Sequence, residues 1–114
     1  MYQVVKIGDR DVPMLAMASV DVYYRNIFGE DPVKAQLSQD EGALVDCMMK
    51  MGFVMAKFAE TKDRKEMNKL NEDNYLDWLD EFYRSDYLEA LPDIRAAYEN
   101  QKAPSSTEKK RADQ

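Results

Sequence analysis

The chain has 114 residues, 45% of them hydrophobic, with one cysteine, no histidine and a net charge of −6. This length and composition indicate one folded domain with a modest core, and the single cysteine excludes a disulfide scaffold. The acidic balance argues against nucleic acid and anionic membranes as partners, and no apolar run reaches the length of a membrane-spanning helix.

Residues 2–14 are predicted to form a β-hairpin. Two β-prone runs flank the polar turn Gly8-Asp9-Arg10, where unusual backbone angles are needed. Pro13 has no N–H, so the second strand should lie at a sheet edge. Because two strands alone are marginal in water, the hairpin must pack on helices.

Two short helices should follow the hairpin. The first is expected over residues 20–28, with Ser19 as its N-cap and Gly29 as its stop. The second is expected over residues 32–37, because proline is tolerated at the first position of a helix.

A long helix is predicted over residues 39–60, because Ser38 and Glu41 have the spacing of a capping box. Its apolar residues form two adjacent faces. The first face holds Leu44, Cys47, Met48, Met51, Met55 and Phe58, and the second holds Val45, Met49, Phe53 and Ala56. This is more apolar surface than a small core needs, so the helix is expected to be central or to form part of an interface.

The C-terminal half combines acidic and aromatic residues. After a charged link over 61–71, helices are expected over 74–82 and 86–100, with Pro92 kinking or dividing the second. Residues 71–100 hold nine carboxylates against two arginines. Their aromatic stripe should face the core while the carboxylates face water.

These elements predict a mainly α fold. An N-terminal β-hairpin should pack on a bundle of about four to five helices, in a single globular domain over residues 1–101. Residues 102–114 are polar and lack aromatics, which predicts a disordered, flexible C-terminal tail.

The sequence predicts no catalytic, cofactor or metal site, and we expect the protein not to be an enzyme. The chain lacks histidine, the commonest general base and metal ligand. Cys47 lies among methionines and is expected to be a buried thiol. The four glycines form no phosphate-binding loop.

Two groups of residues are candidates for binding another protein. The methionine-rich long helix offers an adaptable apolar face, and the later aromatics resemble interface anchors within an acidic rim. The expected contacts are Val45, Met49, Phe53, Met55, Trp78, Phe82 and Tyr87. Core packing is the competing interpretation of both groups. Phe53→Asp is predicted to leave folding mostly intact and to weaken partner binding, whereas global unfolding of this variant would place Phe53 in the core.

The order of four segments resembles a known family. They are Val5-Lys-Ile-Gly-Asp-Arg-Asp-Val-Pro, Tyr23-Tyr-Arg-Asn-Ile-Phe-Gly-Glu-Asp, Tyr75-Leu-Asp-Trp-Leu-Asp-Glu-Phe and Glu89-Ala-Leu-Pro-Asp-Ile. Their order across residues 3–101 is similar to that of the tail assembly chaperones of long-tailed phages and prophages of Gram-positive bacteria.

This resemblance implies a predominantly helical chaperone that binds the tape measure protein. Such a chaperone keeps its partner soluble in the host bacterial cytoplasm, promotes tail tube polymerisation and is not expected in the mature virion. In many members a programmed ribosomal frameshift adds a C-terminal extension, which implies the tail tube protein as a second partner through a longer product. Self-association through the long helix stays open.

Two other functions remain open on the sequence alone. A small acidic phage-encoded regulator or inhibitor could act as a protein-binding module that occupies a basic site on a host protein. A structural tail component would instead remain detectable in purified virions. The acidic block over residues 71–100 supports the first of these alternatives.

Overall fold

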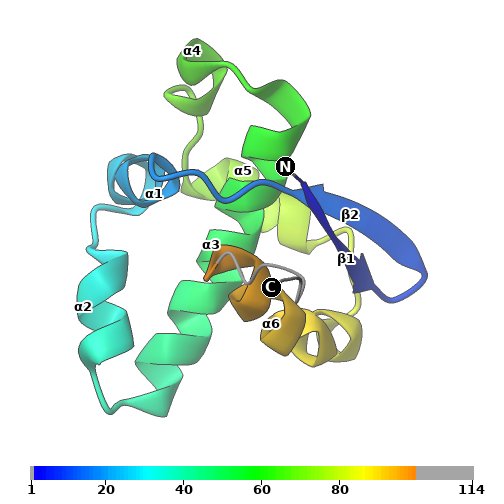
Figure 1. Cartoon of the computed structure of the whole chain (residues 1–114). Helices are drawn as coiled ribbons and strands as arrows, with labels where there is room; N and C mark the ends of the chain where they lie inside the picture. Colours follow the sequence, from blue (N-terminus) through cyan, green and yellow to red (C-terminus); the bar gives the residue numbers. More distant parts are fainter. Residues whose placement is uncertain (1, 100–114) are drawn as a thin grey trace, which may run out of the picture.

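The computed structural model describes residues 2–99, in which a two-stranded antiparallel sheet packs with six helices (Figure 1). The elements are β1 (Gln3–Ile7), β2 (Arg10–Met14), α1 (Val20–Phe28), α2 (Pro32–Leu37), α3 (Glu41–Thr61), α4 (Arg64–Met67), α5 (Glu72–Leu79) and α6 (Arg84–Tyr98). The predicted mainly α fold with an N-terminal hairpin is therefore confirmed. The predicted tail over residues 102–114 lies outside the described residues.

The hairpin forms because a two-residue turn joins two alternating strands. Gly8 adopts a φ of 65°, a left-handed angle that glycine accepts without steric cost, and Ile7 pairs with Arg10 across the turn. Alternate side chains of the two strands face inward and are buried, as a period of two requires. β1 lies against α6 and β2 against α3, so the hairpin covers one side of this helix pair (Figure 1).

Helix α3 runs through the middle of the molecule and contacts β2 and every other helix of the described residues (Figure 1). Its side chains are buried continuously from residue 51 to residue 56. The N-cap is Asp40, whose carboxylate accepts hydrogen bonds from the N–H groups of Gly42 and Ala43 at 2.9 and 3.3 Å. The predicted capping box that starts at Ser38 is therefore wrong. Asp40 is the better cap because its carboxylate satisfies two free N–H groups of the first turn.

The helices before and after α3 follow the expected order with three local differences. Ser19 precedes α1 but makes no side-chain capping bond. The link between α3 and α5 contains the short helix α4, and α5 begins at Glu72 behind a capping box formed by Asn71 and Asn74. Helix α6 is continuous through Pro92, whose ring lies on the exposed side of the helix. The expected division of this helix does not occur.

Two hydrogen bonds at Tyr98 fasten the end of α6 to the first helices. The Tyr98 hydroxyl donates to Asp21 Oδ1 at 2.7 Å and accepts from Gln36 Nε2 at 3.0 Å. Burial, together with the Asp21 carboxylate, raises the pKa of Tyr98 to about 12. The protonated phenol therefore connects α6 with α1 and α2.

Candidate partner-binding groove

An apolar groove lies between α3 and α6 on the molecular surface. It consists of two hollows of about 390 Å³ each, and both are lined by Val45. The first hollow is also lined by Met49, Leu79, Asp80, Phe82, Arg84, Tyr87 and Leu88. The second is also lined by Leu44, Met48, Leu91, Pro92, Arg95, Ala96 and Glu99. We call the two hollows together the α3–α6 groove.

The floor of the groove is set by a close approach of the two helices. The Tyr87 hydroxyl donates a hydrogen bond of 2.6 Å to the backbone carbonyl of Met49. A Cβ atom at Gly52 would lie only 2.5 Å from the Tyr87 hydroxyl oxygen and 3.1 Å from Ile94 Cδ1. Glycine at position 52 therefore lets α6 pack directly on α3. Above this contact the apolar side chains of both helices form the groove walls.

Four of the residues predicted from the sequence come together in the groove. Val45 is 41% exposed, Met49 and Phe82 are half-buried, and Tyr87 is buried beneath them. Val45 stays open because α5 and the hairpin cover the later turns of α3, whereas Val45 lies only one turn into the helix. The exposed part of the predicted methionine face is therefore its N-terminal part.

The other three predicted contact residues belong to the core. Phe53 is 0% exposed, and its ring centroid lies 5.6 Å from that of Tyr75 and 5.8 Å from that of Trp78. Met55 and Trp78 are buried as well. The expectation that Phe53 lies on the surface is therefore wrong, and its burial predicts instead that Phe53→Asp disrupts folding. The physical reason is that α5 packs its aromatic side chains onto this turn of α3, so a carboxylate there would be buried without a partner.

The α6 wall of the groove was not expected from the sequence. Leu88, Pro92 and Ala96 are spaced four residues apart and therefore lie on one face of α6, beside the buried stripe. This second apolar row was the available signal for a groove. The row did not predict a groove, because Pro92 within it indicated a kinked or divided helix and not one continuous face.

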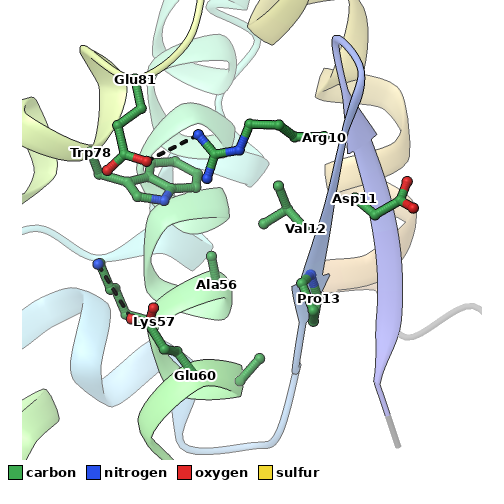
Figure 2. A pocket seen from close by; sticks show the side chains of 10 residues that line it. Arg10, Asp11, Val12, Pro13, Ala56, Lys57, Glu60, Trp78 and Glu81 are labelled. Atoms are coloured by element: carbon green, nitrogen blue, oxygen red, sulfur yellow. Dashed lines mark hydrogen bonds and ion pairs between the residues drawn. The ribbon is translucent and has the colours of Figure 1, made fainter.

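A second pocket, of about 310 Å³, lies between the hairpin and α3 (Figure 2). Arg10 reaches across its mouth from β2, and its guanidinium donates to Glu81 at 3.0 Å and lies 4.6 Å from the Phe82 ring centroid. Lys57 Nζ lies 3.4 Å from Glu60 Oε1 on another wall. Asp11, which also lines this pocket, lies 3.7 Å from Lys6 Nζ, so each charged group of the lining has an ion-pair partner.

The buried thiol and the half-buried lysine of α3 are held in unreactive forms. Burial raises the pKa of the Cys47 thiol, so the thiolate that would act as a nucleophile is disfavoured. Burial lowers the pKa of Lys50, but hydrogen bonds to Asp46 and Glu30 outweigh this effect and the net shift is upward. In the part of the chain that the structure describes, no three acidic, histidine or cysteine side chains are grouped to hold a metal ion.

Within residues 2–99, none of the helices is both long enough and apolar enough to cross a membrane. Comparison of the chain with protein-family models, with curated proteins and with solved structures finds no significant match.

Proposed function

We propose that this protein is a phage tail assembly chaperone that binds helical segments of the tape measure protein in the α3–α6 groove. The observation that carries the proposal is the groove itself, which gathers apolar side chains of α3 and α6 around an open hollow in a chain of net charge −6. A groove between two helices is a common docking site for a third, amphipathic helix. A tape measure protein is a long, helical and apolar chain, which is the kind of partner that such a groove accepts.

The composition of the groove suits a chaperone that must release its partner. Met48 and Met49 have flexible, polarisable side chains that adapt to irregular apolar surfaces. The apolar area is small, so each copy would bind weakly, and many copies along one partner would act together. The net charge of −6 keeps coated assemblies in solution by mutual repulsion.

Co-expression with a tape measure fragment tests the proposal. We expect the wild-type protein to keep the fragment in the soluble fraction and to co-purify with it. Val45→Asp should abolish both effects, because it places a charge in the middle of the groove. The matched control is Val33→Asp, because Val33 lies on α2 outside the groove and is 45% exposed, close to the 41% of Val45.

Circular dichroism should show that both variants are folded. If the fragment aggregates in the presence of at least equimolar wild-type protein, the proposed function is wrong. Absence of the protein from purified virions would separate a chaperone in the host cytoplasm from a structural tail component. A frameshifted longer product that binds the tail tube protein would extend the proposal to the second partner.

A specific observation favours one alternative, a small acidic regulator that occupies a basic site on another protein. Glu72, Asp73 and Asp77 of α5 are exposed and have no ion pair within the described residues. Such a regulator would bind through these carboxylates. Its binding should weaken steeply with salt and should survive Val45→Asp, which is the opposite of what we expect for the groove.

A further inference from the structure

The outer edge of α6 beside the groove is acidic. Leu88 and Pro92 line the groove, and the residue after each of them lies about 100° further around the helix, toward solvent. These outer residues are Glu89 and Asp93. Both are exposed, and neither has an ion pair or hydrogen bond to another side chain of the described residues. Two unpaired carboxylates therefore lie on α6 outside the row of Leu88 and Pro92, although neither lines the hollows themselves.

The same edge also offers a hydrogen-bond acceptor. In a regular helix the N–H of residue 92 would bond to the carbonyl of residue 88, but proline has no N–H. Pro92 is exposed and lies one turn after Leu88, so the Leu88 carbonyl is on the same side of α6 as the proline ring. The carbonyl and the two carboxylates are all hydrogen-bond acceptors, so a partner with hydrogen-bond donors would suit this edge.

The α3 side of the groove is acidic too. Glu41 lies one turn before Val45, is exposed and has no ion pair within residues 2–99. Asp46 follows Val45 on the outer side of α3, where its carboxylate is 2.9 Å from Lys50 Nζ. Because Lys50 neutralises Asp46, the unpaired carboxylate on the α3 side is that of Glu41.

The two arginines of the acidic segment do not reverse this pattern. Arg95 is neutralised by Glu99, with 3.1 Å between Nε and Oε2. Arg84 is the first residue of α6 and lines the groove at one end, near Asp80. Positive charge is therefore confined to one end of the groove and is balanced elsewhere.

We infer that the α3–α6 groove selects an amphipathic helix whose apolar stripe is flanked by lysine or arginine residues. This inference rests on the proposed function and names the class of segment that the groove accepts. The apolar stripe would lie on Val45, Leu88 and Leu91, and basic side chains on each flank would reach the carboxylates of the two edges. A second copy of this acidic chain would instead bring carboxylates against carboxylates.

Two synthetic helical peptides test this selection. They share one leucine stripe, and one carries lysines beside it where the other carries glutamates. Titration calorimetry with the full-length protein should show that the lysine peptide binds about tenfold more tightly at low salt, with a smaller ratio at high salt. Equal affinity for the two peptides, or no binding of either, would overturn the inference.

Charge reversal at the groove separates local recognition from the net charge of the protein. Glu89→Lys with Asp93→Lys should remove or invert the preference for the lysine peptide. The control is Glu60→Lys with Glu66→Lys, because these exposed residues near the far end of α3 give the same change in net charge. If the two double variants behave alike, only long-range charge is at work and the inference fails.

Other outcomes distinguish the inference from the proposed function. If the lysine peptide binds to the groove but no tape measure fragment does, the function is wrong and the selectivity stands. If a fragment binds equally well to the wild type and to the Glu89→Lys/Asp93→Lys variant, the selectivity is wrong and the function stands. Dimerisation of the wild type that is lost in Val45→Asp would show that the groove holds a second copy, which would also refute the inference.

Discussion

Replacing Gly52 with alanine should destabilise the protein, although alanine is the better helix former. In an exposed helix interior the same change would stabilise by about 1 kcal/mol. Here the new Cβ would lie 2.5 Å from the Tyr87 hydroxyl oxygen and 3.1 Å from Ile94 Cδ1. Tyr87 cannot simply swing away, because it is buried, bonded to the Met49 carbonyl and packed against Trp78 with 5.6 Å between the ring centroids.

The expected magnitude follows from three opposing effects. Overpacking a dense core costs about 1–3 kcal/mol. Displacing the Tyr87 hydroxyl loses a hydrogen bond worth about 1 kcal/mol. After the gain in helix propensity, Gly52→Ala should lower the free energy of unfolding by about 1–3 kcal/mol. For a domain of this size a loss of about 2 kcal/mol lowers Tm by roughly 10 °C.

Urea denaturation followed by Trp78 fluorescence and by circular dichroism would measure this loss. Gly42→Ala is the matched control in the same helix, because a Cβ there would meet only Asp40 Oδ1, at 3.3 Å. We expect this control to keep the stability of the wild type or to raise it by up to about 1 kcal/mol, because Gly42 is exposed in the first turn of α3.

A double-mutant cycle identifies the cause of the loss. Tyr87→Phe removes the oxygen atom that meets the new Cβ, so Gly52→Ala should cost about 1 kcal/mol less in that background. If the losses of stability in Gly52→Ala and Tyr87→Phe simply add in the double variant, the cost of Gly52→Ala comes from a contact other than the Tyr87 hydroxyl. A Gly52→Ala variant as stable as the wild type would refute the close helix approach on which the groove floor depends.

Three further predictions concern the core and the buried hydroxyl and thiol groups. Phe53→Ala should cost about 3–5 kcal/mol and Phe53→Asp should prevent folding, which circular dichroism would detect; a folded Phe53→Asp variant would place Phe53 on the surface after all. Because the pKa of Tyr98 is raised in the folded state, its contribution to stability is complete below about pH 10 and is lost as the pH rises toward about 12. Unfolding curves across this range should fall less steeply for Tyr98→Phe, and equal slopes would contradict a raised pKa of Tyr98 in the folded state. Cys47 should react with a thiol reagent only at the rate of unfolding, and fast labelling of the native protein would show that the thiol is accessible.

Local sequence patterns predicted the type and order of most elements. The Gly8-Asp9 turn and the alternating strands beside it specify a hairpin, and Pro32 and Gly29 mark helix boundaries, because each of these features acts within a few residues. The cap of α3 was predicted at Ser38 and lies at Asp40, because both residue types can cap a helix. The choice between them depends on backbone angles at Asp40 that no spacing rule reveals.

The candidate site required the tertiary structure. The sequence identified α3 as having more apolar surface than one face can bury, and it named Val45, Met49 and Phe82 as candidates. It also named Phe53, which the structure buries, because burial depends on which later segment packs on each turn of a helix. α5 covers the turn that contains Phe53, whereas Val45 and Met49 in the first turns of α3 face the partly open row of α6. The apolar pattern of α3 was thus determined by the sequence alone, while the part of it that remains open to a partner was decided by contacts between segments far apart in the chain.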